Sequence, residues 1–223
     1  MFIWSFLSSN SRLMQRKKLL PSIKNLKNSK IKNLVDTRLR EFKEIGNGSN
    51  NEIFEELCFC ILTANFNAER SMKIQMEIGD EFLTISKSHL AKKLRALGHR
   101  FPNRRARYIF DARRHKNILK DIVKTFNDDN ELRGWLVKNV KGIGYKEASH
   151  FLRNIGYTSY AIIDFHIIDV LTKHEIIEKP NVLTKRKYLE IEDVLRKIAR
   201  KSNLNLAELD LYLWYMETGK ILK

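Results

Sequence analysis

Apolar and polar residues alternate along most of the chain with the period of an amphipathic helix. The first clear segment begins at Ser49, which forms a capping-box pattern with Glu52. Apolar residues then recur three or four positions apart, from Ile53 through Leu57 to Ala64. This spacing places them on one face, so the segment is predicted to be a helix with a buried side.

Segments with the same period follow one another to the end of the chain. They are opened or marked by Ser86, by Asp128 to Asn130, by apolar residues around 148–155 and 188–198, and by Asn205 with Glu208. Gly98 and Gly219 stand just past two of these segments, where a left-handed residue commonly ends a helix. The run YAIID resembles a strand but has no second strand to pair with. The pattern therefore predicts an all-α protein of about ten helices.

Composition supports this prediction and adds a large positive charge. Among 223 residues only 9 are Gly and 3 are Pro, which leaves few of the tight turns that all-β folds need. The chain has 42 Lys and Arg against 26 Asp and Glu, a net charge of +16. Such an excess points to an acidic partner, either nucleic acid or an anionic membrane. No apolar run approaches the roughly 20 residues of a membrane-spanning helix, and no long basic amphipathic helix stands out, which disfavours a membrane surface.

The N-terminus and the two cysteines bear on location. A short apolar run near the start precedes the basic residues, the reverse of a secretory signal, so residues 1–20 are predicted to be a disordered extension.

Cys58 and Cys60 lie two apart in a predicted buried helix, where they point in different directions and do not suit a disulfide. Two core thiols indicate a reducing, intracellular location, and they are too few for a four-cysteine zinc or iron–sulfur site.

The most informative stretch is VKGIGYKEASHFLRNIGY. Its two predicted helices are separated by Lys141, Gly142, Ile143 and Gly144. Two glycines around one apolar residue form a tight hairpin, which is expected to leave backbone N–H groups exposed at the start of the second helix. That geometry binds phosphate without reading the base sequence. Helix pairs of this kind also occur as structural corners, and Glu147 stands where a dinucleotide-binding loop would have its third glycine.

Two ionisable residues follow the hairpin. Lys146 falls in the first turn of the second helix, where a lysine opposes the helix dipole. It is either a solvated surface lysine or an amine nucleophile whose pKa is lowered by desolvation and nearby positive charge. Asp164 comes eighteen residues later, after the apolar Ala161–Ile163. Asp164 fits a helix N-cap, and the N–H bonds of a cap would also orient a catalytic carboxylate and keep it ionised.

The hairpin, Lys146 and Asp164 together resemble the helix-hairpin-helix glycosylase superfamily. The segments ELCFCILTAN, GHRF, KGIGYKEASHFLRNIGY, AIID and LDLYLWY resemble more closely the type 2 8-oxoguanine DNA glycosylase/AP lyases, found largely in archaea. The likeness runs from about Leu26 to the C-terminus. It implies an all-α fold of two helical domains. The N-terminal and C-terminal helices would form one, and a central bundle near 55–160, with the helix-hairpin-helix near 130–156, would form the other.

The same resemblance implies a DNA repair enzyme that flips its target base, because the glycosidic bond is unreachable inside a stacked duplex. A monomer would bind double-stranded DNA containing 8-oxoguanine, with the lesion in the cleft between domains. Lys146 would attack C1′ of the damaged nucleotide, and the resulting Schiff base would permit β-elimination, which cuts the strand 3′ to the lesion. Asp164 would stabilise the positive charge that develops on the sugar and help to activate the lysine.

The resemblance also implies functional roles for other residues, and most of these residues have a purely structural explanation as well. Asn65 would fill the gap left by the flipped base, or simply end a helix. Phe101 and Trp214 would stack on the extruded base, although a Trp at helical spacing is also typical of a core. Asp210 would accept a hydrogen bond from the guanine edge, or be an exposed helix residue. Lys223, the C-terminal residue, matches a terminus that helps to form the lesion pocket.

One position departs from the family. Phe165 stands where relatives in this branch usually carry Arg, between Asp164 and His166. A basic contact near the scissile sugar would then be missing, although an apolar residue occurs at this position in the eukaryotic-type 8-oxoguanine enzymes. His166 itself would contact the DNA backbone, or be a plain helix-face histidine.

Two alternatives stay open at this level. A base-excision enzyme for another oxidised base or an adenine mismatch would share the fold, but Lys146 argues against a purely monofunctional enzyme. The adenine branch is further disfavoured because the chain lacks the C-terminal cysteine cluster of the endonuclease III relatives. A non-catalytic helix-hairpin-helix protein would explain the charge and the hairpin, but not Lys146 and Asp164 at this spacing. No metal site and no cofactor are expected.

Overall fold

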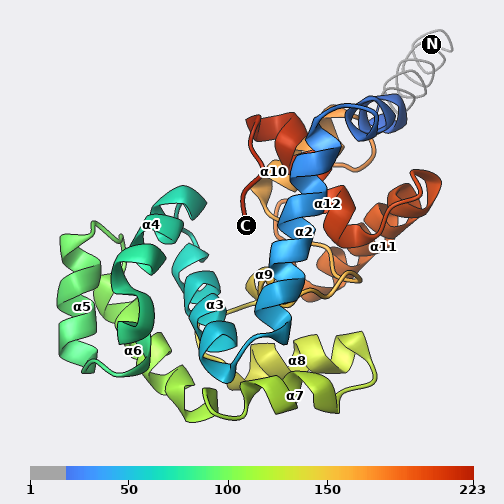
Figure 1. Cartoon of the computed structure of the whole chain (residues 1–223). Coiled ribbons are helices and arrows are strands. Elements are labelled where there is room, and N and C mark those ends of the chain that lie inside the picture. Colours follow the sequence, from blue (N-terminus) through green and yellow to red (C-terminus); the bar gives the residue numbers. More distant parts are fainter. Residues whose placement is uncertain (1–18) are drawn as a thin grey trace, which may run out of the picture. The chain divides into compact units, whose positions relative to one another are not determined.

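The computed structural model describes residues 19–223, which form helices joined by loops (Figure 1). The described residues contain no strand, so the all-α prediction is confirmed for them, and YAIID is an extended segment that has no strand beside it among those residues. Residues 19–27 are helical and bury Leu19, so the last two residues of the extension predicted at 1–20 belong to a helix. Residues 1–18 lie outside the described part of the chain.

The other elements follow in order along the chain. They are α2 (Ile31–Asn47), α3 (Asn50–Thr63), α4 (Ala68–Ile78), the 3-10 helix η1 (Gly79–Leu83), α5 (Lys87–Ala96), α6 (Pro102–Ala112), the 3-10 helix η2 (Arg113–His115), α7 (Leu119–Thr125), α8 (Asp129–Asn139), α9 (Tyr145–Asn154), α10 (Phe165–Lys173), α11 (Lys185–Lys201) and α12 (Leu206–Thr218).

The helices divide into two compact units. Unit 1 contains the described residues up to Leu39 together with Ala161–Ile221, and unit 2 contains Arg40–Tyr160 with the last two residues, Leu222 and Lys223. The division falls inside α2. The central bundle predicted near 55–160 lies within unit 2, which also carries the hairpin.

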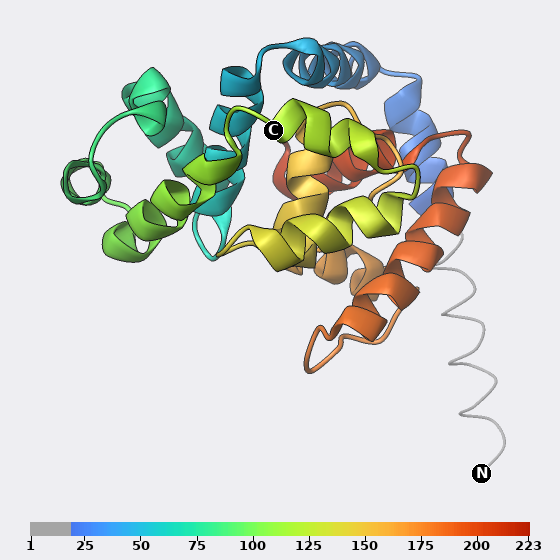
Figure 2. The ribbon, with the colours of Figure 1, turned by 90° about the horizontal axis from the view of Figure 1, so that it is seen from below.

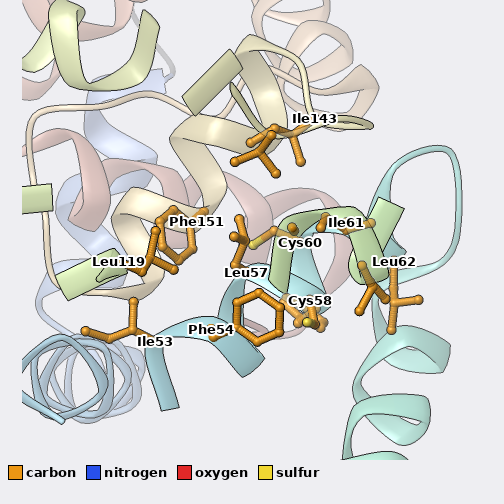
Figure 3. Packing of buried hydrophobic residues seen from close by; sticks show 14 of the residues in the cluster. Ile53, Phe54, Leu57, Cys58, Cys60, Ile61, Leu62, Leu119, Ile143 and Phe151 are labelled. Carbon is orange, nitrogen blue, oxygen red and sulfur yellow. The ribbon is translucent and has the colours of Figure 1, made fainter. Parts of the chain in front are cut away.

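The core of unit 2 is built around α3. Ten of its residues between Ile53 and Thr63 are buried, and a helix that is apolar on nearly every side must be covered on nearly every side. Helices α4, α6, α7 and α9 pack against it. Figure 3 shows Phe151 of α9 and Leu119 of α7 among the side chains of α3. The capping box of Ser49 and Glu52 begins α3, as the sequence predicts.

The two cysteines lie inside this core. Cys58 and Cys60 are free, fully buried thiols, as predicted from their place in ELCFCILTAN. Burial raises the pKa of both well above its ordinary value, because a thiolate is poorly solvated there. A buried thiol with a raised pKa is unreactive, so their role is packing.

Unit 1 is built from α10, α11 and α12 together with the first helix and the start of α2. Helix α12 packs against α10 and α11, and Figure 2 shows α11 along its length. The capping box of Asn205 and Glu208 begins α12, and Gly219, left-handed with φ 71°, ends it. Both boundaries agree with the sequence prediction.

One carboxyl group in unit 2 makes stability depend on pH. Burial, followed by the hydrogen bond and charge of Asp80, raises the pKa of Glu55 from its ordinary value of 4.5 to about 7. A raised carboxyl pKa means that the folded state favours the protonated form. This contribution to stability is present below pH 4.5 and is lost as pH rises through 7.

Glu55→Gln should therefore stabilise the protein at pH 8 and change little at pH 4.5. Because the side chain is half-exposed, we expect a gain in unfolding free energy of only about 1 kcal/mol at pH 8. Urea unfolding at both pH values measures it, with the exposed Glu77→Gln on α4 as the matched control. A gain of equal size at both pH values would contradict this explanation.

Candidate active site

The hairpin Lys141–Gly144 connects α8 to α9, and its shape requires glycine at Gly142. This residue has φ 89°, and a Cβ built on it would lie 2.1 Å from Cδ2 of Tyr108 on α6. Ile143, 7% exposed, turns inward to the core of unit 2. Lys141 is largely exposed and pairs with Asp111 at 3.2 Å. The hairpin is therefore packed against α6 on one side and leaves the side chain of Lys141 accessible.

A buried arginine holds α8 and α9 together. Arg133 of α8 is 1% exposed, and its Nη1 donates to Oγ of Ser149 on α9 at 3.1 Å. Its guanidinium also lies 5.1 Å from the ring centroid of Tyr145 and 5.2 Å from that of Tyr160. The hydrogen bonds to Ser149 and Asn130, together with these cation–π contacts, stabilise the buried charge. The start of α9 is consequently fixed relative to α8.

Lys146 is the second residue of α9, as predicted, and it contacts a carboxylate. Its Nζ lies 3.3 Å from Oε1 of Glu147, and the two side chains are 25% and 14% exposed. Oε2 of the same carboxylate accepts the N–H of Gly144 at 3.0 Å. The expectation that the hairpin leaves its N–H groups exposed is therefore wrong for Gly144. Glu147 accepts the hydrogen bond of this N–H, as the glutamate of a capping box does.

Asp164 is the N-cap of α10, as the sequence predicts. Its Oδ1 accepts the N–H of Ile167 at 3.0 Å, and its side chain is partly buried. The extended segment before it is held from α11: Glu192 accepts the N–H of Ala161 at 3.0 Å, and the hydroxyl of Tyr188 donates to the carbonyl of Ala161 at 2.6 Å. The carboxylate therefore stands on a fixed backbone at the start of a helix.

Three aromatic rings lie together in unit 1 beside Asp164. The centroid of His166 is 4.5 Å from that of Trp214 on α12, and 3.9 Å from that of Phe165, which is 66% exposed. Nε1 of Trp214 is buried without a hydrogen-bond partner among the described residues. An unpaired buried N–H is costly, so it marks a place where an acceptor from outside the chain would be bound favourably.

Asp210 lies one turn before Trp214 and is buried, only 8% exposed. The alternative of an exposed helix aspartate is therefore wrong. With Ile162, Ile167 and Leu213, Asp210 lines a small cavity of about 10 Å³.

Phe101 and Asn65 lie in the loops of unit 2. Phe101 directly precedes α6, and the guanidinium carbons of Arg100 and Arg105 lie 5.0 Å and 5.8 Å from its ring centroid. Asn65 follows the last residues of α3 in the left-handed conformation, φ 56°, and is exposed. Asn tolerates this conformation better than most residues. The exposed position fits either reading, since Asn65 both ends the helix and projects from it.

Lys223 docks into a buried polar network of unit 2. Its Nζ lies 2.7 Å from Oε2 of Glu56 and 2.5 Å from Oε1 of Gln75, and 4.5 Å from the ring centroid of Phe59. Glu56 is 2% exposed, and its other oxygen accepts from Nδ2 of Asn154 on α9 at 2.6 Å. The C-terminal residue is thus anchored inside the unit that carries Lys146.

Sequence reasoning misses Glu147, the Glu56 network and His150. His150 lies one turn after Lys146 and is 7% exposed, and burial, followed by the charge of Arg153, lowers its pKa well below the ordinary value. A glutamate three residues after Gly144, and a glutamate at the start of the apolar run ELCFCILTAN, are signals that could have revealed two of them. Among the described residues, no group of three or more His, Cys, Asp or Glu could hold a metal ion. None of the described helices is long and apolar enough to cross a membrane.

Known proteins resemble this chain over nearly its whole length. A family model described as 8-oxoguanine DNA glycosylase matches residues 35–204. The 8-oxoguanine DNA glycosylase/AP lyase of Methanocaldococcus jannaschii is 57% identical over 206 residues, which cover 92% of this chain and 99% of the relative. The protein of the same name from Korarchaeum cryptofilum is 52% identical over 206 residues, 92% of this chain and 98% of the relative.

Solved structures agree with the sequence relatives. The crystal structure of the Methanocaldococcus jannaschii 8-oxoguanine glycosylase/lyase in complex with 15mer DNA containing 8-oxoguanine has a TM-score of 0.89 at 57% identity, and covers 92% of this chain and 99% of that one. The 8-oxoguanine DNA glycosylase of Thermotoga maritima has a TM-score of 0.87 at 42% identity, with 93% and 100% covered. By its sequence and its fold, the chain belongs to the 8-oxoguanine DNA glycosylase family.

Proposed function

We propose that this protein excises 8-oxoguanine from double-stranded DNA and then cuts the strand by β-elimination, as a base excision repair enzyme. The observation that carries the proposal is Lys146, a partly buried amine two residues after the hairpin, beside the carboxylate of Glu147. A non-catalytic hairpin protein has no need of an amine held in this way. The excess of basic residues, +16 overall, fits a DNA partner.

Lys146 is the proposed nucleophile. Its amine must lose a proton before it can attack C1′, and a carboxylate 3.3 Å away is a base within reach. The new N–C1′ bond forms as the glycosidic bond breaks, and 8-oxoguanine leaves with the bonding electrons and takes up a proton. Opening of the sugar ring then gives the Schiff base. Loss of a proton from C2′ expels the 3′ phosphate and cuts the strand.

Asp164 is the proposed electrostatic partner of the sugar. Positive charge develops on C1′ and the ring oxygen as the base departs, and a fixed carboxylate stabilises that charge more in the transition state than in the ground state. The N–H of Ile167, 3.0 Å away, orients the carboxylate for this role. The position of Asp164 as the N-cap of α10 supports this role, because the cap fixes the carboxylate to the helix backbone.

The remaining family positions are proposed as DNA contacts. Phe101 and Trp214 stack on the extruded base, Asp210 and the Lys223 terminus complete its pocket, and Asn65 fills the gap in the duplex. The hairpin Lys141–Gly144 and His166 hold the DNA backbone. The unpartnered Nε1 of Trp214 and the exposed left-handed Asn65 support these assignments. The monomeric state and the intracellular location stay predictions of the sequence.

A substrate panel tests the proposal. Duplexes that carry 8-oxoguanine, an oxidised pyrimidine or an adenine mismatch are incubated with the protein and borohydride, which reduces a Schiff base to a stable adduct. We expect an adduct with 8-oxoguanine alone. An adduct confined to the oxidised pyrimidine would support the alternative, a glycosylase/lyase for another base. No adduct with any duplex would support a non-catalytic DNA-binding protein.

Phe165→Arg should strengthen DNA binding. The side chain is exposed at the start of α10, next to Asp164 and His166, so an arginine there is free to meet a phosphate. One added phosphate contact should steepen the slope of log affinity against log salt by about 0.9. Val182→Arg, at another exposed apolar residue of unit 1, is the matched control. Equal slopes for the parent and Phe165→Arg would exclude the hypothesis that Phe165 leaves a phosphate contact missing.

A further inference from the structure

Both ring nitrogens of His99 are engaged by backbone groups. This residue lies in the loop between α5 and α6 and is 4% exposed. Nδ1 accepts the N–H of Phe101 at 3.0 Å, and Nε2 lies 3.1 Å from the carbonyl oxygen of Leu62. Because a nitrogen that accepts an N–H carries no proton, the neutral ring must carry its proton on Nε2 and donate it to Leu62. The two contacts therefore select one tautomer.

The contact with Leu62 fixes the end of α3. The carbonyls in the last turn of a helix lack partners within the helix and must find them elsewhere. His99 supplies a donor to Leu62, and Arg105 of α6, 5% exposed, supplies one to the carbonyl of Ala64. Asn65 follows immediately in the left-handed conformation. The turn that presents Asn65 is thus held by two buried side chains, the imidazole of His99 and the guanidinium of Arg105.

The contact with Phe101 fixes the loop between α5 and α6. The backbone N–H of Phe101 is bound by the same imidazole, and the ring of Phe66, next to Asn65, packs on His99 with centroids 4.2 Å apart. Burial, followed by the charges of Arg105 and Arg70, lowers the pKa of His99. The ring therefore stays neutral near pH 7, as an acceptor at Nδ1 requires.

We propose that His99 is a positioning residue that holds the turn at Asn65 and the backbone of Phe101 in one arrangement, so that gap filling and base stacking occur together. The inference rests on the proposed roles of Asn65 and Phe101. His99 acts on extrusion of the base, a step that precedes attack at C1′. A duplex with a preformed abasic site has no base to extrude, so its cutting through Lys146 should not need His99.

Two substitutions separate the two contacts. His99→Asn keeps an acceptor near the position of Nδ1 but is too short to reach Leu62, whereas His99→Gln keeps a donor near Nε2 but loses the acceptor. We expect each to slow single-turnover release of 8-oxoguanine about tenfold, scored after alkali treatment so that base loss is measured independently of strand cutting. Cutting of a preformed abasic site should stay within about twofold of the parent. His89→Gln, an exposed histidine on α5, is the matched control.

A double-mutant cycle distinguishes positioning from general damage. If His99 acts through Phe101, the effect of His99→Gln should shrink when Phe101→Ala is already present. Equal slowing of base release and abasic-site cutting, or full additivity with Phe101→Ala, would overturn the inference. If Phe101→Ala and Asn65→Ala leave base release unchanged, the proposed pocket roles fail instead.

A measurement on the parent protein needs no variant to fold. The ¹⁵N chemical shifts of the His99 ring should show a neutral imidazole with its proton on Nε2 at pH 7.5. A proton on Nδ1 would contradict the hydrogen bond from Phe101 and overturn the inference.

Discussion

Lys146→Gln is expected to abolish strand cutting at 8-oxoguanine, with a loss of about 10³-fold or more. An amide cannot form the Schiff base through which β-elimination proceeds. The glutamine side chain is nearly as long as lysine and can still donate to Oε1 of Glu147, so the capping contact from Glu147 to Gly144 should survive. Gel separation of cut and uncut strands measures the loss.

Lys124→Gln, an exposed lysine in the last turn of α7, provides the control for removal of one positive charge. It should cut at the parental rate. Binding of Lys146→Gln to a duplex with a tetrahydrofuran abasic analogue should stay within about threefold of the parent, since one charge is a small part of a net charge of +16. Strand cutting by Lys146→Gln at the parental rate would eliminate Lys146 as the nucleophile.

Asp164→Asn should slow release of 8-oxoguanine by about 10²–10³-fold while leaving DNA binding intact. The substitution removes the negative charge that stabilises the sugar in the transition state. It keeps an oxygen that can accept the N–H of Ile167, and Asn is as good an N-cap as Asp, so α10 should remain folded. Single-turnover kinetics and a thermal unfolding curve measure the two properties separately.

Asp128→Asn makes the same change at the N-cap of α8, where Asp128 accepts the N–H groups of Asn130 and Glu131. It should leave base release unchanged. If Asp164→Asn releases 8-oxoguanine at the parental rate, Asp164 acts only as a helix cap. A fall in rate matched by a fall in unfolding temperature would indicate that capping, not charge, explains the effect.

Local patterns in the sequence predict much of the fold. The capping boxes at Ser49 and Asn205 begin α3 and α12, and Asp164 begins α10, because each depends on residues only three positions apart. The placement of Lys146 in the first turn of α9 follows from the two glycines of the hairpin for the same reason. Helix caps and tight turns depend on residues close together in the sequence, so they can be predicted from short segments.

Contacts between distant segments could not be predicted. The ion pair of Lys223 with Glu56 joins residues 167 positions apart, and the bond from His99 to Leu62 joins residues 37 apart. Nothing in either segment alone selects its partner, since packing of the whole unit brings them together. Asp210 illustrates the same limit, because its helical position is clear from the sequence but its burial depends on neighbouring helices.

The central claim is that one amine, Lys146, becomes covalently attached to the damaged strand. The direct measurement is peptide mapping by mass spectrometry of the adduct trapped with borohydride on an 8-oxoguanine duplex. We predict that the sugar remnant is found on Lys146 alone. Attachment to another lysine, or to the N-terminal amine, would contradict the claim.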